Sequence, residues 1–222
     1  MLRFRLFGFP VTVEPWHWAI LAFIGGGLRI RDKEDLLPVI LFMVAGFVSI
    51  LIHELGHAFM SRLFGCRHVA IVLHGAGGVA ISQGARFNRG QDILVSAAGP
   101  GLQAFCGGVT LVLFLTGIIP GGPATNLPGT PPTNLVDIFV GVSLIWALIN
   151  LIPVYPLDGG QILQNILGPR RIQLTLAISI VAAVIIGGWL VLNGYYLFAI
   201  FLGFFTWQNY KMLSQLGANR GW

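Results

Sequence analysis

Charged side chains are scarce in this chain of 222 residues, where they make up 9% of the sequence and hydrophobic residues make up 55%. A soluble globular domain carries about 25% charged residues. The mean hydropathy of +0.81 is also far more apolar than that of an ordinary soluble domain. The composition therefore excludes an ordinary soluble protein and predicts a polytopic protein of the lipid bilayer.

Cysteine is almost absent, since Cys66 and Cys106 are the only two. We expect Cys66 in a cytoplasmic loop and Cys106 inside a membrane span, so a disulfide between them is not expected. Neither lies in a CxxC pair, which is the spacing typical of thiolate zinc sites. The sequence also shows no repeat and no added soluble domain, so we expect one intramembrane domain over residues 1–222.

Long apolar stretches predict about six transmembrane helices. They lie at residues 16–28, 36–64, 91–119, 135–156, 172–193 and 194–213. The last two meet at Asn193-Gly194 and should form a helical hairpin. Residues 1–15 alternate in polarity and offer no cleavage site for a signal peptide, so a short strand or surface segment is expected there. The predicted fold class is an all-α polytopic membrane protein.

The lysines and arginines predict its orientation, because cytoplasmic loops carry an excess of them. Three basic residues fall on one side of the predicted spans: Arg29, Arg31 and Lys33. Ten fall on the other side, with both termini: Arg3, Arg5, Arg62, Arg67, Arg86, Arg89, Arg170, Arg171, Lys211 and Arg220. Both termini are therefore expected in the cytoplasm. The basic residues are dispersed among loops, so no nucleic-acid partner is expected.

One apolar stretch contains a charged motif, His53-Glu54-Leu55-Gly56-His57. On a helix the two histidines fall at i and i+4, on one face, and the glutamate between them can reach water at a metal. A charged side chain inside a spanning helix costs about 3 kcal/mol on insertion scales. The pattern therefore predicts a zinc site with Glu54 as general base.

A catalytic zinc takes three protein ligands and keeps one position open, so a third ligand is needed. Four of the five aspartates lie in a loop on the opposite side or begin a span: Asp32, Asp35, Asp92 and Asp137. Asp158 differs, because Pro153 and Pro156 interrupt the helix before it. Irregular backbone in a membrane usually lines a polar cavity, although a solvated turn residue is the alternative. Asp158 is the candidate third ligand, at a depth similar to that of the histidines.

The chain resembles the site-2 protease family of intramembrane zinc metalloproteases, through HELGH at 53–57 and NLIPVYPLDGG at 150–160. The stretch SAAGPGLQ at 96–103 is similar to the family's small-residue stretch, with Gln103 where asparagine is common. The segment LHGAGGV at 73–79 resembles its membrane-associated β-hairpin. The resemblance is to the compact form, without an appended PDZ or CBS domain.

The resemblance implies one zinc ion per chain, bound by His53, His57 and Asp158, with Glu54 as general base. It also implies that Asn150 hydrogen-bonds the substrate or the developing oxyanion, although a hydrogen bond in helix packing is the alternative role. Residues 69–81 would bind an unwound substrate by β-augmentation, with a tight surface turn as the alternative.

The function predicted from these motifs is intramembrane endopeptidase, cleaving within or near the transmembrane segment of single-span proteins. The implied substrate has first been trimmed by another protease, and the site is reached from the cytoplasm. A zinc-binding membrane carrier, sensor or scaffold is the alternative, but pure binding needs no base such as Glu54. A zincin with a glutamate as third ligand is disfavoured, because no glutamate follows position 54. No GxSG-type serine nucleophile motif is present.

Overall fold

The computed structural model describes residues 1–75, 77–119 and 134–218. Within these residues the strands are β1 (Leu2–Leu6), β2 (Phe9–Val13), β3 (His68–His74) and β4 (Gly77–Gln83). The helices are α1 (Pro15–Ile24), α2 (Leu36–Leu63), α3 (Arg89–Leu115), α4 (Leu135–Asn150), α5 (Asp158–Leu167), α6 (Ile172–Leu192) and α7 (Tyr196–Ala218). Two compact units are formed, Met1–Arg86 with Ala98–Leu148, and Phe87–Ala97 with Ile149–Trp222.

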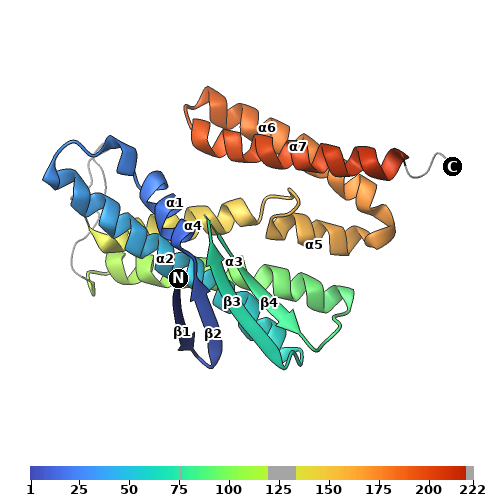
Figure 1. Ribbon diagram of the computed structural model, residues 1–222, viewed down its shortest axis with the longest axis horizontal. Coiled ribbons are helices and arrows are strands. Elements are labelled where there is room, and N and C mark those ends of the chain that lie inside the picture. Colours follow the sequence, from blue (N-terminus) through green and yellow to red (C-terminus); the bar gives the residue numbers. More distant parts are fainter. Residues whose placement is uncertain (76, 120–133, 219–222) are drawn as a thin grey trace. The chain divides into compact units, whose positions relative to one another are not determined.

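The four strands form one sheet in the order β1-β2-β3-β4, which leaves β1 and β4 at its edges (Figure 1). The pairs β1/β2 and β3/β4 are antiparallel, and β2/β3 is parallel. Alternate residues of the two central strands are buried, as expected where one face of a sheet packs on a core. They are Phe9, Val11 and Val13 in β2 and Val69, Ile71 and Leu73 in β3. The hairpin β3–β4 packs on α2.

The sheet is larger than the sequence predicted. The hairpin expected within residues 69–81 is present as β3 and β4. The segment at residues 1–15, expected as a short strand or surface segment, forms a second hairpin, β1–β2. Phe7 and Gly8 connect its strands, with φ of 50° and 81°. Positive φ at both central residues is typical of the tight turns that join antiparallel strands. The predicted fold, all-α with one short β-hairpin segment, therefore did not include the second hairpin or a four-stranded sheet.

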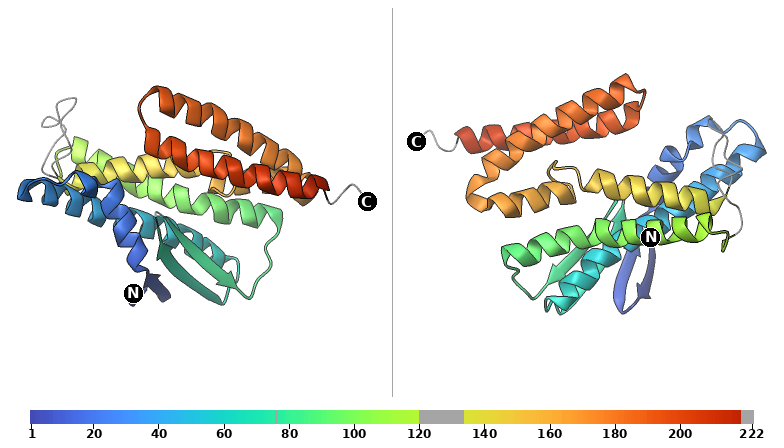
Figure 2. Two further views of the ribbon diagram at one scale, coloured as in Figure 1. Left: turned by 45° about the horizontal axis from the view of Figure 1, so that its top comes forward. Right: turned by 180° about the vertical axis from the view of Figure 1, so that it is seen from behind.

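Within the described residues, three helical segments are long and apolar enough to cross a membrane: Lys33–Leu63, Arg89–Leu115 and Pro169–Leu192. Helices α1 and α4 are shorter apolar helices. Helix α4 ends at Asn150 instead of continuing to residue 156, and α5 was not predicted. The antiparallel pair α6–α7 matches the expected hairpin, as both views of Figure 2 show. The total of six spans stays a prediction.

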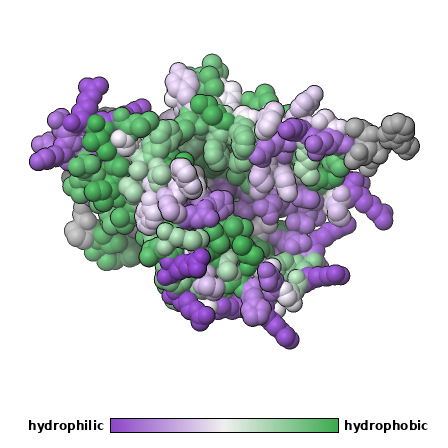
Figure 3. Space-filling model, in the orientation of Figure 1, coloured by the Kyte–Doolittle hydropathy of each residue, from purple (hydrophilic) through white to green (hydrophobic). Residues whose placement is uncertain are grey.

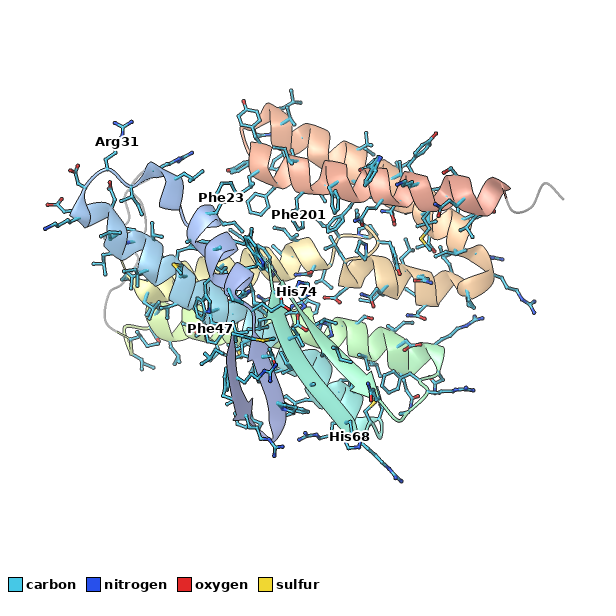
Figure 4. All side chains as sticks on the ribbon, in the orientation of Figure 1. Phe23, Arg31, Phe47, His68, His74 and Phe201 are labelled. Atoms are coloured by element: carbon cyan, nitrogen blue, oxygen red, sulfur yellow. The ribbon has the colours of Figure 1, made fainter. Side chains whose placement is uncertain are left out.

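Helix α2 carries exposed apolar side chains at helical spacing, Leu37, Ile40, Val44 and Val48. Figure 3 shows hydrophobic surface in green and hydrophilic residues in purple, which cover the loop where Figure 4 labels Arg31 and also parts of the sheet. An exposed apolar stripe of this kind marks contact with another apolar phase. In a chain of this composition, the phase is the lipid bilayer.

Helices α3 and α4 begin with side-chain caps. The backbone N–H of Gln91 donates to Asn88 Oδ1 over 3.0 Å, and the N–H of Asn88 donates to Gln91 Oε1 over 3.0 Å. Before α4, the N–H of Asp137 donates to Asn134 Oδ1 over 2.8 Å. These caps satisfy donors that have no partner inside the helix, and they fix where each helix starts.

The second unit holds an irregular segment at residues 151–157, which leads into α5. The N–H of Tyr155 donates to Ser179 Oγ over 3.0 Å. Asn209 Nδ2 donates to the carbonyl oxygen of Tyr155 over 2.7 Å. Val154 is buried among Ala183, Leu202 and Phe205 of α6 and α7. The α6–α7 hairpin therefore anchors the backbone just before Asp158.

In the first unit, α3 approaches the C-terminal half of α2 very closely. A Cβ atom at Gly56 would collide with the carbonyl oxygen of Ala98. A Cβ atom at Gly101, on α3, would have nothing within 4 Å. Only glycine at position 56 therefore permits this approach of the two backbones.

We predict opposite effects for alanine at these two positions. Alanine normally favours a helix over glycine by about 1 kcal/mol, so Gly101→Ala should keep or raise the stability of the protein. Gly56→Ala should lower it, because α3 must move away from α2. Thermal unfolding in detergent, followed by circular dichroism, compares the two variants. A Gly56→Ala variant as stable as the wild type would contradict the close packing described here.

Candidate metal centre

His53 and His57 lie one turn apart on α2, with their Nε2 atoms facing each other. Their Nε2 atoms are 3.0 Å apart, and the ring planes are tilted by 76°. Two imidazole nitrogens bound to one tetrahedral zinc, each at about 2.0 to 2.1 Å, lie about 3.3 Å apart. The two rings therefore need only a small adjustment to share one metal ion.

Asp158 is the first residue of α5, and its side chain is buried. The candidate ligand atoms of His53, His57 and Asp158 all lie within 4.8 Å of one another. Two imidazoles and a carboxylate form a donor set that suits zinc and leaves one position of a tetrahedron open. The residues present thus fit one zinc ion, as the sequence predicted.

Neither cysteine joins this group in the part of the chain that the structure describes. Cys66 is buried after the end of α2, and Cys106 is half-buried on α3, both as free thiols. His68 and His74 lie at opposite ends of β3 (Figure 4). Among the described residues, neither belongs to the group of candidate ligands.

A side chain of α3 contacts the ring of His53 at its Nδ1 atom. His53 Nδ1 and Gln103 Oε1 are 3.0 Å apart, and Gln103 Nε2 donates to Ser49 Oγ over 2.8 Å. A carbonyl oxygen only accepts hydrogen bonds, so Nδ1 of His53 carries the proton. The lone pair of His53 is then on Nε2, the atom that faces His57. The sequence indicated Gln103 only as a departure from a motif and did not predict this contact.

The ring of His57 lies against the backbone of α3. A Cβ atom at Gly99 would collide with His57 Nε2. Gly99 and Gln103 are four positions apart on α3, as His53 and His57 are on α2. One face of α3 therefore contacts both histidines, and this spacing within SAAGPGLQ was the available signal.

Glu54 is buried under strand β4. A Cβ atom at Gly78 would lie 2.6 Å from Cγ and 2.8 Å from Cδ of Glu54. A Cβ atom at the neighbouring Gly77 would have nothing within 4 Å. The edge strand of the sheet thus passes directly over the candidate base, and glycine at position 78 leaves space for its carboxylate.

Asn150 is the last residue of α4 and is half-buried. The irregular segment 151–157 begins directly after it. The sequence correctly indicated a break in regular helix at the prolines of this segment. The role of Asn150 toward a substrate stays a prediction.

Comparison with known proteins gives consistent matches along the chain. The family model described as Peptidase M50B-like matches residues 36–120, and that described as Peptidase family M50 matches residues 125–192. A zinc metalloprotease of Methanocaldococcus jannaschii is 28% identical over 75% of this chain. A proposed zinc metalloprotease of Synechocystis sp. is 34% identical over 72% of it.

A solved structure supports the same assignment at the level of the fold. The site-2 protease from Methanocaldococcus jannaschii superposes with a TM-score of 0.64 at 24% identity, covering 96% of this chain and 94% of that one. The chain spans less than half of the two metalloprotease relatives, 45% and 42% of their lengths. The family models, the relatives and the fold agree, and the chain belongs to the site-2 protease family of M50 zinc metalloproteases.

Proposed function

We propose that this protein is an intramembrane endopeptidase that hydrolyses peptide bonds within or near the transmembrane segment of single-span membrane proteins. The observation that carries the proposal is the placement of Glu54 between His53 and His57 on a long apolar helix. The 28 residues of α2 extend about 42 Å at 1.5 Å per residue, more than the hydrocarbon core of about 30 Å. The hydrolytic group is therefore built into a helix of spanning length.

The reaction needs a base, an acid and a polarised carbonyl. His53, His57 and Asp158 would hold a zinc ion, which would supply Lewis acidity toward water and the substrate carbonyl. Glu54 accepts a proton from the attacking water and then donates it to the leaving amine. Burial of Glu54 under β4 limits the orientations of its carboxylate, which favours both transfers.

Asn150 is proposed to donate a hydrogen bond to the substrate carbonyl or to the oxyanion that forms from it. A neutral amide suits a site that excludes water, because it stabilises charge without introducing its own. Asn150 is the last residue of α4, directly before the irregular segment at residues 151–157. That arrangement is compatible with a peptide lying beside it.

Strand β4 is the proposed binding element for the substrate. A peptide bond within a helix is shielded by the helix's own hydrogen bonds, so the substrate must unwind before it is cleaved. As an edge strand, β4 can pair with an extended peptide by β-augmentation. Because Gly78 lies on Glu54, a peptide paired with this strand would run close to the base.

The topology proposed with this function has six spans, both termini in the cytoplasm and access to the site from that side. The excess of lysine and arginine on the side of the termini supports it. A substrate already trimmed by another protease would enter more easily, since a large outer domain would obstruct its approach. A metal carrier or sensor with the same ligands is the competing function, and Glu54 is the residue that separates the two.

The deciding experiment replaces the base without changing its size. We expect Glu54→Gln to retain the zinc of the wild type and to lose cleavage of single-span peptides by about 100-fold or more, since general base catalysis alone contributes about 10² to 10⁴. Zinc content and cleavage products are measured on the same reconstituted sample. Undiminished cleavage by the variant would rule out Glu54 as base. Zinc binding by a wild type that cleaves no peptide would favour the carrier.

Two neighbouring glycines test the contact between β4 and the base. Gly78→Ala should lower kcat, because its methyl group must displace Glu54, while zinc content stays at the wild-type level. Gly77→Ala should have little effect, since nothing lies within 4 Å of its Cβ position. Steady-state cleavage and metal analysis of both variants provide the comparison. Equal activity of the two would contradict the assigned contact.

A further inference from the structure

We propose that Gln103 is a positioning residue for the metal centre, which orients the imidazole of His53 and fixes the nitrogen that carries its proton. The inference rests on the proposed zinc site and adds a residue that acts through His53. Its basis is a buried chain of hydrogen bonds, which runs from His53 through Gln103 and Ser49 to Ser143. The chain connects α2, α3 and α4.

Each contact in the chain has good hydrogen-bond geometry. The distances are 3.0 Å from His53 Nδ1 to Gln103 Oε1, 2.8 Å from Gln103 Nε2 to Ser49 Oγ, and 3.0 Å between the hydroxyl oxygens of Ser49 and Ser143. Gln103, Ser49 and Ser143 are each 0% exposed, and His53 is 5% exposed. Water therefore does not replace any of these partners.

The chemistry of the amide makes the chain directional. If the amide of Gln103 were reversed, its N–H group would face His53, and Nδ1 would have to accept a hydrogen bond. The proton of the neutral ring would then sit on Nε2, where it would block metal binding. The hydroxyl groups of Ser49 and Ser143 are compatible with both orientations of the amide, because each hydroxyl can donate or accept a hydrogen bond. Ligation through Nε2 thus requires the carbonyl oxygen of Gln103 to face His53.

Side chains behind a ligating histidine commonly act in this way. A ligating histidine usually donates its second N–H to a carbonyl or carboxylate, and loss of that partner costs about 10- to 100-fold in metal affinity or activity. Gln103 is held in turn by Ser49, which lies one helical turn before His53 on α2. The same helix therefore supplies the ligand and the group that anchors its partner.

The test measures metal binding directly, in the full-length protein in detergent. Gln103→Met removes the amide and keeps an unbranched side chain of similar length. We expect it to raise the Kd for zinc by about 10- to 100-fold in competition with a chelator. We also expect it to alter the visible absorption of bound Co²⁺ and to lower kcat more than it changes KM. Ser49→Ala, which removes one oxygen atom, should raise the Kd by a smaller factor.

Gln103→Glu is the rescue variant, because a carboxylate keeps an acceptor for Nδ1–H and can accept from Ser49. Its zinc affinity should be close to that of the wild type. Ser143→Ala, at the far end of the chain, should likewise bind zinc almost as tightly. Tight zinc binding by Gln103→Met would overturn the proposal. Equal weakening in the Met and Glu variants would also overturn it, because packing alone would then explain the loss. A wild type that binds no zinc would instead refute the metal centre itself.

Discussion

The rest of the structure depends on burying polar groups inside an apolar helix. A polar atom removed from water without a hydrogen-bond partner costs several kcal/mol in hydrocarbon surroundings. The chain places His53 and Glu54 within the buried part of α2, so their neighbours must compensate. For His53, the structure shows how: an amide and two hydroxyl groups, all buried, continue its hydrogen bonding across three helices.

Close approach of backbones is the second requirement of this site. Three glycines each face a neighbour that leaves no space for a side chain: Gly56 faces α3, Gly99 faces His57, and Gly78 faces Glu54. Together they bring a helix and an edge strand against the motif on α2. The small residues of this family's motifs thus have a physical role here, because they surround the reactive side chains with backbone.

The sequence allowed the chemistry to be predicted better than the architecture. The two histidine ligands and the proposed base depend on residue type and helical spacing within 53–57, which are local properties. The break before Asp158 was predictable because proline cannot continue a helix. Helix α5 was not, because it follows a segment with two prolines and itself begins with Asp158-Gly159-Gly160, a pattern typical of a loop.

The contacts between distant segments could not be predicted. The pairing of β2 with β3 joins strands that are separated by two helices in the sequence, so no local pattern indicates it. The contact of Gln103 with His53 joins residues 50 positions apart. A glutamine in an apolar helix indicates only that some partner is present. The close approach of α3 to α2 determines which atom the glutamine contacts, and Gly56 and Gly99 permit that approach.

X-ray absorption at the zinc edge of the purified protein tests the central claim most directly, because it reports the ligand atoms themselves. The account predicts one zinc per chain with nitrogen and oxygen ligands only, at about 2.0 to 2.2 Å, and with the outer-shell pattern of two imidazoles. Sulfur at about 2.3 Å would show that Cys66 or Cys106 binds the metal and would contradict a centre built from His53, His57 and Asp158.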